Sequence, residues 1–393
     1  MRKLVAGISL AVIVSMGSLV LAAEGDAPTV KGNIEIYGVA KVSYDMIDTG
    51  AKAPADQKLQ KVSSNSSRLG FKGSEDVGDG LNAVFQLELQ VNLDGTQTTV
   101  VSSVTPSPVS SKTTDIDRIT YRNSFLGLSH KAAGTLLLGI YDTPYKISTG
   151  RLDLFADSMG DYNAVIGTVN GTANFELRAK DTVVYLSPSW SGISFALSRS
   201  MTGSTNSSTG TSSGTESNNN NLGSASLTSA SVVYDAKPLY FSAAYEIHKN
   251  GYTTWDSDGS ENKGTKFGAG FTFGNTKISA VYEMIKDEKP NTDKTRNAWY
   301  IAASQTFGKE TIKIAYANAR DGDSLTTNTG ATWMAVGIDH ALSKRATIYA
   351  LYAQTKNEAN ATYGLGTSGP GGSYTPGAGE DPSVVSFGIN YTF

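Results

Sequence analysis

The sequence has no cysteine, only three histidines and, beyond its first 22 residues, no apolar run of eighteen residues. The lack of cysteine excludes a disulfide framework. The lack of long apolar runs excludes a membrane-spanning helix after the N-terminal segment. Long helical patterns are also missing, and the formal net charge of -3 argues against a nucleic-acid partner. No shift in composition divides the 393 residues, so we expect one sheet-rich domain.

The first 22 residues have the pattern of a secretory signal peptide. A short basic start, Met1-Arg2-Lys3, precedes an apolar run from Leu4 to Leu21, and Val20 and Ala22 occupy the small positions before a cleavage site. The alternative is a retained N-terminal anchor, which is disfavoured because no basic segment follows the run. We therefore expect 1–22 to be a signal peptide and 23–393 to form the mature domain.

The last ten residues, 384–393, are the most informative segment of the sequence. Val385, Phe387, Ile389, Tyr391 and Phe393 alternate with small or polar residues, which is the two-residue period of a strand with one apolar face. Such a strand, ending on an aromatic residue, suits the closing strand of a membrane β-barrel.

About sixteen segments of the chain show the same alternation. They lie near 32–47, 62–73, 80–93, 117–130, 134–141, 175–187, 190–201, 225–235, 238–249, 264–273, 276–286, 296–307, 310–319, 331–341, 345–356 and 383–393. Their connections alternate between short polar turns and long segments, the long ones being 48–61, 94–116, 142–174, 202–224, 250–263, 287–295, 320–330 and 357–382. Short periplasmic turns and long external loops are typical of a transmembrane β-barrel, so we predict an all-β fold of sixteen antiparallel strands.

Three patterns that resemble chemical sites lack the context those sites require. The histidines His130, His248 and His340 fall at separate places in the strand series, so a lipase-like Ser-His-acid arrangement is not expected. The glycines of 364–369 match a dinucleotide fingerprint in spacing only, because no strand–helix unit surrounds them. Asp256–Gly259 resembles the start of a calcium loop without its distal glutamate. We expect no catalysis, cofactor or metal ion.

Charged residues inside the predicted strands indicate more about function than these three patterns do. The polar phase of the strands carries Lys41, Arg68, Glu88, Arg118, Arg122, Arg178 and Lys180. A charge facing lipid at mid-depth costs about 2–4 kcal/mol, so these side chains are expected to face the lumen. One interpretation is general lumen polarity, and the sharper one is a basic cluster on the channel wall. Asp181 falls on the lipid phase, which indicates a bulge, a register error or a subunit contact.

The longest connection, 142–174, carries both acidic and apolar residues. Asp153, Asp157 and Asp161 lie close to Leu152, Leu154, Phe155 and Met159. A long loop with its own apolar residues is better explained as packed than as free. Folded into the barrel, it would narrow the pore, and its acids would face the basic wall across a transverse field.

The chain resembles the Gram-negative general porins, the sixteen-stranded trimeric diffusion channels. The matching stretches are Tyr37-Gly38, Ser67–Asp76, Gly80–Glu88, Arg122–Leu128, Gly134–Gly139, Val183–Pro188, Leu342–Arg345 and the terminal Phe393. The resemblance spans the whole mature chain, and 67–88 and the C-terminus are its most specific parts. The Pro-Glu-Phe-Gly type motif often found in the third loop of that family is missing here.

The resemblance implies a site and a set of partners. Its basic wall corresponds to Arg68, Arg122 and Arg178, with Lys41 as a fourth member, and Glu88 matches the acid beside them. Asp153, Asp157 and Asp161 lie in the inward-folded third loop. The implied protein is a homotrimer in the outer membrane of a Gram-negative bacterium, in contact with lipid and lipopolysaccharide, and passes small hydrophilic solutes and ions. Phe393 is the implied signal for the outer-membrane assembly machinery.

Three other functions are compatible with parts of the pattern. A substrate-specific channel for an anion or an oligosaccharide would be blocked saturably by one solute at micromolar concentration. A barrel lipase would react with serine-directed probes. An adhesin would lose host or phage binding, but not conductance, when loops 202–224 and 357–382 are deleted.

Overall fold

The computed structural model describes residues 33–51, 58–95, 98–101, 113–116, 120–173, 175–200, 226–249, 261–289, 292–322, 327–366 and 373–393. The expected signal peptide 1–22, Arg118, the loop 202–224 and the Asp256–Gly259 segment lie outside these ranges. In the described ranges, no helix has the length and apolarity needed to cross a membrane. Residues Gly32–Phe393 form one unit with its own contacts.

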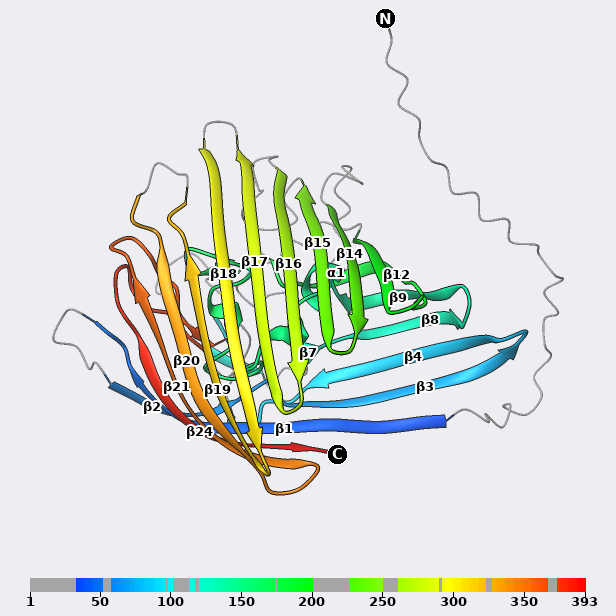
Figure 1. Ribbon diagram of the computed structural model, residues 1–393, viewed down its shortest axis with the longest axis horizontal. Coiled ribbons are helices and arrows are strands. Elements are labelled where there is room, and N and C mark those ends of the chain that lie inside the picture. Colours follow the sequence, from blue (N-terminus) through cyan, green and yellow to red (C-terminus); the bar gives the residue numbers. More distant parts are fainter. Residues whose placement is uncertain are drawn as a thin grey trace, which may run out of the picture. The chain divides into compact units, whose positions relative to one another are not determined.

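The described strands form a closed antiparallel barrel (Figure 1). In chain order its segments are β1 (Asn33–Asp48), β2 (Lys58–Ser64), β3 (Arg68–Gly78), β4 (Leu81–Gln90), β7 (Thr120–Tyr121), β8 (Ser124–His130), β9 (Gly134–Asp142), β12 (Arg178–Leu186), β13 (Ile193–Ser200), β14 (Ser226–Ala236), β15 (Leu239–Lys249), β16 (Glu261–Phe273), β17 (Thr276–Lys289), β18 (Thr292–Phe307), β19 (Glu310–Ala319), β20 (Ala331–Ala341), β21 (Ala346–Asn357) and β24 (Ser383–Thr392). Both β2 and β3 pair with β1, and both β7 and β8 pair with β4, so each couple is one interrupted strand. The eighteen segments therefore make sixteen strands, as predicted.

The C-terminal strand closes the barrel against the first. β24 pairs with β1 from Val39 opposite Thr392 to Asp48 opposite Ser383. Beyond the ladder, the Phe393 amide donates to the Gly38 carbonyl at 3.1 Å, and the Gly38 amide donates to the Phe393 carbonyl at 3.0 Å. A Cβ on Gly38 would lie 2.4 Å from the Phe393 ring, so this close approach requires glycine. Closure removes both sheet edges.

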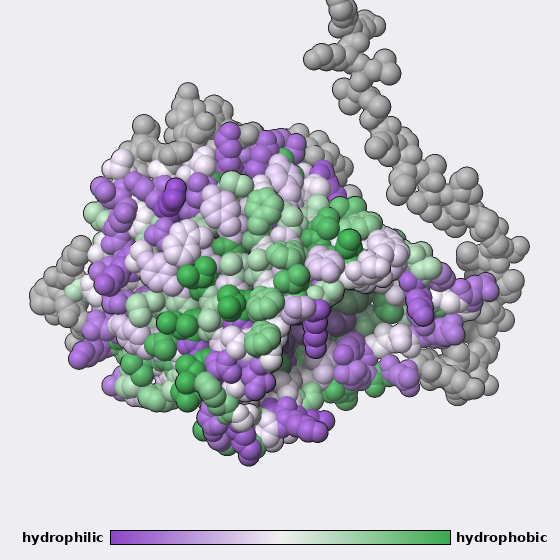
Figure 2. Space-filling view, in the orientation of Figure 1, coloured by the Kyte–Doolittle hydropathy of each residue, from purple (hydrophilic) through white to green (hydrophobic). Residues whose placement is uncertain are grey.

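The two faces of the strands differ as the alternation predicts. On β24, Val385, Phe387 and Ile389 are exposed on the outer surface, whereas Ser386 is fully buried. Figure 2 shows hydrophobic side chains gathered over the middle of the strands, with hydrophilic ones toward their upper ends. An apolar outer band of this kind is what contact with lipid requires.

Turns and loops alternate around the barrel, with one correction. The chain reverses within two residues between β14 and β15, between β16 and β17, and between β18 and β19. The predicted long connection 287–295 is wrong, because β17 continues to Lys289 and β18 starts at Thr292. Asp181 lies in a bulge, since the β9–β12 register shifts between Ala179 and Thr182. The bulge explains a charge on the nominal lipid phase.

The connection between β9 and β12 folds inward and carries short elements of its own. They are α1 (Pro144–Ile147), η1 (Gly150–Leu152), η2 (Tyr162–Ala164), β10 (Thr168–Val169) and β11 (Thr172–Ala173). Leu152, Phe155 and Met159 are buried in one cluster with wall residues such as Tyr300 and Trp333. The loop therefore packs on the inner wall, as its apolar residues predicted.

Glycines on the inner face of β16 make room for this loop. A Cβ on Gly264 would lie 2.6 Å from the ring of Phe175, and one on Gly268 would lie 2.7 Å from Leu152. Both approaches are too close for any larger residue without displacement of the loop. The alternating glycines of β16 thus fix where the loop lies.

Candidate functional site: the lumen constriction

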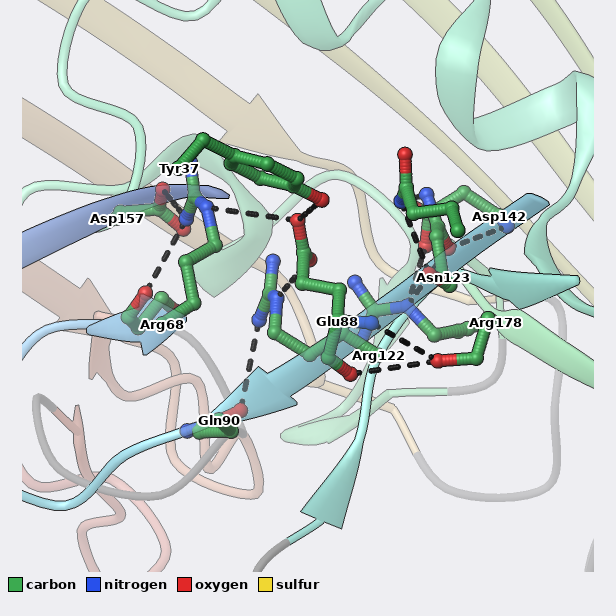
Figure 3. Close-up of polar contacts among 12 residues, drawn as sticks. Tyr37, Arg68, Glu88, Gln90, Arg122, Asn123, Asp142, Asp157 and Arg178 are labelled. Carbon is green, nitrogen blue, oxygen red and sulfur yellow. Dashed lines mark hydrogen bonds and ion pairs between the residues drawn. The ribbon is translucent and has the colours of Figure 1, made fainter. Parts of the chain in front are cut away.

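Three arginines from alternate strands of the barrel converge beside the inward loop (Figure 3). Arg68 begins β3, Arg122 lies between β7 and β8, and Arg178 begins β12. Their side chains are partly exposed, with relative accessibilities of 23%, 14% and 20%. Guanidinium groups stay charged at any relevant pH, so this wall carries permanent positive charge.

Glu88 on β4 holds two of these arginines in place. Its Oε1 accepts from Arg122 Nε at 2.7 Å, and its Oε2 lies 4.0 Å from Arg68 Nε. The Tyr37 hydroxyl donates to the same carboxylate at 2.8 Å, and Arg122 also reaches Gln90. Glu88 is nearly buried, and its hydrogen bonds to a charged partner are of the stronger kind. The carboxylate orients the arginines and offsets part of their charge.

Asp142 has the equivalent role for the third arginine. Its Oδ1 lies 3.1 Å from Arg178 Nε and 3.1 Å from Lys146 Nζ. The Asn123 amide donates to its Oδ2 at 3.0 Å and accepts from Arg178 with its own oxygen. Asp142, Asn123 and Tyr37 were not predicted as site residues. Tyr37 and Asn123 lie in stretches that carry the family resemblance, and Asp142 is the first residue of the long connection 142–174. None of these signals indicates a partner of the arginines.

One acidic residue at the tip of the loop, Asp157, contacts the basic wall. Asp157 Oδ2 lies 3.3 Å from Arg68 Nη1. Burial raises the pKa of Asp157, but the neighbouring Arg68 and Lys41 charges outweigh it and lower the pKa. The Lys41 ammonium donates to the Ala156 carbonyl at 2.8 Å, so Lys41 binds the same loop tip. These contacts bring Arg68, Lys41 and Asp157 together.

The structure places Asp153 and Asp161 inside the loop. Asp153 accepts from the backbone amides of Phe155 and Tyr162, and Asp161 accepts from those of Asp157 and Asn163. Both are buried, at 8% and 3% exposure. Burial raises the pKa of Asp153 to about 6, and burial together with the charge of Asp153 raises that of Asp161. The two carboxylates shape the loop and have no ion pair with the arginine wall among the described residues.

A buried carboxylate on the opposite wall fastens both ends of the loop. Glu283 on β17 accepts from the Tyr145 hydroxyl at 2.8 Å and from the Gly167 amide at 2.8 Å. Arg296 on β18 donates to it at 2.8 Å, and both charged side chains are at most 2% exposed. Lys266 on β16 forms a second buried ion pair, with Glu176 of the loop. We call Glu283, Arg296, Lys266 and Glu176 the loop anchor. Sequence reasoning missed it, because its members are far apart in the chain.

The loop anchor gives a prediction for pH. Burial raises the pKa of Glu176 to about 7, despite the nearby Lys266 charge. An unfolded glutamate has a pKa of about 4.3, so this group lowers the free energy of unfolding as pH rises from about 4 toward 7. Its slope is at most about 1.4 kcal/mol per pH unit. In detergent, the Glu176→Gln variant should show a flatter pH dependence of unfolding than the wild type.

Glu75→Gln, at an exposed position near the end of β3, is the matched control and should keep the wild-type profile. Parallel profiles for wild type and Glu176→Gln between pH 5 and pH 7 would contradict the assignment. The free energies come from guanidinium titrations followed by tryptophan fluorescence.

A closed barrel of membrane-spanning strands with a charged, loop-narrowed lumen is the architecture of a channel protein. The sequence model described as Gram-negative porin matches residues 9–361, and the chain belongs to that family. It is 26% identical to the outer membrane porin protein 32 of Delftia acidovorans over 387 residues, covering 95% of this chain and 97% of the relative. It is 26% identical to the major outer membrane protein P.IA of Neisseria meningitidis serogroup B, covering 72% of this chain and 74% of the relative.

Solved structures share the fold. An anion-selective porin from Comamonas acidovorans matches with a TM-score of 0.72 at 22% identity, over 92% of this chain and 100% of that one. The trimer form of OmpT, an outer membrane protein of Vibrio cholerae, matches with a TM-score of 0.62 at 15% identity, over 92% and 99% of the two chains. The chain is thus an outer-membrane β-barrel of a porin family, whose relatives are channels.

Proposed function

We propose that the protein passes small hydrophilic solutes and ions through a water-filled lumen by passive diffusion, without catalysis. The observation that carries this proposal is the inward loop, whose tip meets the arginine wall through Asp157 and Arg68. A pore narrowed in this way excludes solutes by size and selects among ions by its field. No covalent chemistry is needed.

The charges of the constriction divide into two sides. Arg68, Arg122, Arg178 and Lys41 form the basic side, and Glu88 and Asp142 offset part of its charge from within the same wall. On the loop, Asp157 presents the acidic side, and Asp153 and Asp161 hold the loop in the shape that presents it. The basic side exceeds the acidic charge facing it, which favours anions. The likeness to a Comamonas acidovorans porin that is described as anion-selective supports the same preference.

The partners follow from the family and from the outer surface. We assign the functional unit as a homotrimer, a form also named for OmpT of Vibrio cholerae. The apolar outer band contacts outer-membrane lipid and lipopolysaccharide, and residues 1–22 are the signal peptide of a mature chain 23–393. Phe393, paired with Gly38 at the closing strand, is the residue recognised by the outer-membrane assembly machinery.

Liposome swelling tests the diffusion mechanism. Vesicles carrying the refolded trimer should swell in isosmotic sugars at rates that fall steeply with sugar size and rise linearly with concentration. Protein-free vesicles are the control. Rates that saturate for one sugar and ignore the size of the others would instead indicate a substrate-specific channel.

A further inference from the structure

A polar cavity lies beside the loop tip. It measures about 190 Å3 and lies between the loop and the inner wall of β1, β19, β20, β21 and β24. Its polar lining includes Lys41, Asp153, Lys313, Asp339, Thr347 and Asn390. A single water needs roughly 10–15 Å3 of such space, so the cavity has room for an organic solute of several heavy atoms.

Two ammonium groups line this cavity, and each is held by few contacts. Lys41 Nζ donates to the Ala156 carbonyl at 2.8 Å and lies 5.5 Å from the centre of the Tyr349 ring. Lys313 Nζ lies 2.9 Å from Asp339 Oδ1 and 4.8 Å from the centre of the Phe155 ring. A lysine ammonium has three N–H donors, so each can bind a further oxygen.

Acceptor groups line the same cavity. The Asp339 side chain is 29% exposed, and its described ion pair engages Oδ1. The Asn390 side-chain oxygen is buried and has no hydrogen-bond partner among the described residues. A buried polar atom of this kind calls for a partner, either water or a ligand donor. Asp153 adds negative charge, although its oxygens already accept backbone amides.

The mixture of charges restricts the ligand. A simple anion bound to the lysines would lie beside the carboxylates of Asp339 and Asp153, and a simple cation would lie beside both lysines. An α-amino acid carries a carboxylate and an ammonium group within a few ångströms of each other. It offers acceptors to the lysine side and donors to Asp339 and Asn390, so both charges are compensated.

We propose that this cavity is a residence site for zwitterionic solutes of α-amino acid size on their way through the channel. The carboxylate binds Lys41 and Lys313, and the ammonium binds Asp339 and the Asn390 oxygen. The proposal rests on the proposed channel function, since solutes reach the cavity only through the lumen. It adds a preferred solute class to a channel that otherwise discriminates by size and field.

Current recordings on the full-length trimer in planar bilayers at low salt test the proposal. L-Alanine at neutral pH should reduce the open-channel current with a saturable dependence on concentration. Propionate and ethylammonium, which carry one charge each at similar size, should not do so at equal concentrations. Lys313→Met and Asp339→Asn should each raise the half-blocking alanine concentration at least roughly tenfold (about 1.4 kcal/mol). Lys309→Gln, on the exposed β18–β19 turn, should leave it unchanged.

Each single variant leaves one charge without its partner, which could impair folding. The Lys313→Met/Asp339→Asn double variant removes both charges of the ion pair and avoids this problem. Folded trimer is verified by its mobility shift on heating. Equal block by propionate would replace the zwitterion site with a simple anion site. Normal conductance without block by alanine would overturn the inference and leave the channel proposal standing. Folded trimer without conductance would overturn both.

Discussion

Replacing Arg68, Arg122 and Arg178 together with glutamine is expected to move the ion selectivity of the channel strongly toward cations. The three guanidinium groups are the permanent charges of the constriction wall, and a passing ion meets them where the loop narrows the lumen. One unit charge at 4 Å contributes about 1 kcal/mol even at the dielectric constant of water. Loss of three such charges, screened by salt, should lower the anion-to-cation permeability ratio roughly tenfold, or about 1.4 kcal/mol.

The reversal potential under a potassium chloride gradient measures this ratio. The matched control is the Lys309→Gln/Lys344→Gln/Arg345→Gln variant, which removes the same number of positive charges from exposed turns. It should keep the wild-type potential, because solvent screens those charges away from the lumen. If both triple variants shift the potential equally, net charge and not the constriction sets selectivity. The arginine variant keeps the negative charge of Glu88 in the constriction, and this charge should raise its cation selectivity further.

Replacing Glu283 with alanine is expected to release the inward loop. The substitution removes the acceptor for Tyr145 and Gly167 and leaves Arg296 buried without its carboxylate. Removing one partner of a buried ion pair costs about 3–5 kcal/mol. The cost falls on the contacts that hold the loop, so the variant should show larger and noisier single-channel currents than the wild type.

Two further variants separate the loop from the barrel. Tyr145→Phe deletes one hydrogen bond to the loop anchor and should give a smaller effect in the same direction. Glu75→Ala, at an exposed position near the end of β3, should conduct as the wild type does. If Glu283→Ala forms folded trimers with unchanged current amplitude and noise, the loop is held by its apolar packing alone.

The sequence was sufficient for most of the barrel because strand alternation is a local signal. Residues 81–90 alternate so regularly that the strand and its lumen face follow directly, and the same holds for the terminal strand. The error at 287–295 has a physical origin. Polar, charged residues there look like a loop, but β17 and β18 continue pairing beyond the lipid-facing band, where the alternation of apolar residues no longer marks them.

The site was predictable only in part, because its contacts cross the barrel. The lumen phase of Arg68 and Arg122 follows from the strand period. Nothing in the sequence indicates that Glu283 binds Tyr145, 138 positions away, or that Glu176 binds Lys266, 90 positions away. Nor does composition distinguish Asp157, which reaches Arg68, from Asp153 and Asp161, which accept amides of their own loop. That distinction depends on the path of the loop.

Single-channel conductance of the purified wild-type trimer across a range of potassium chloride concentrations tests the central claim most directly. A water-filled diffusion channel with a net basic constriction should insert in conductance steps, often as triplets. Its conductance should rise nearly linearly with salt, and under a salt gradient its reversal potential should have the sign for anion preference. Folded trimer that inserts without conductance, or conductance that saturates at low salt, would contradict the account.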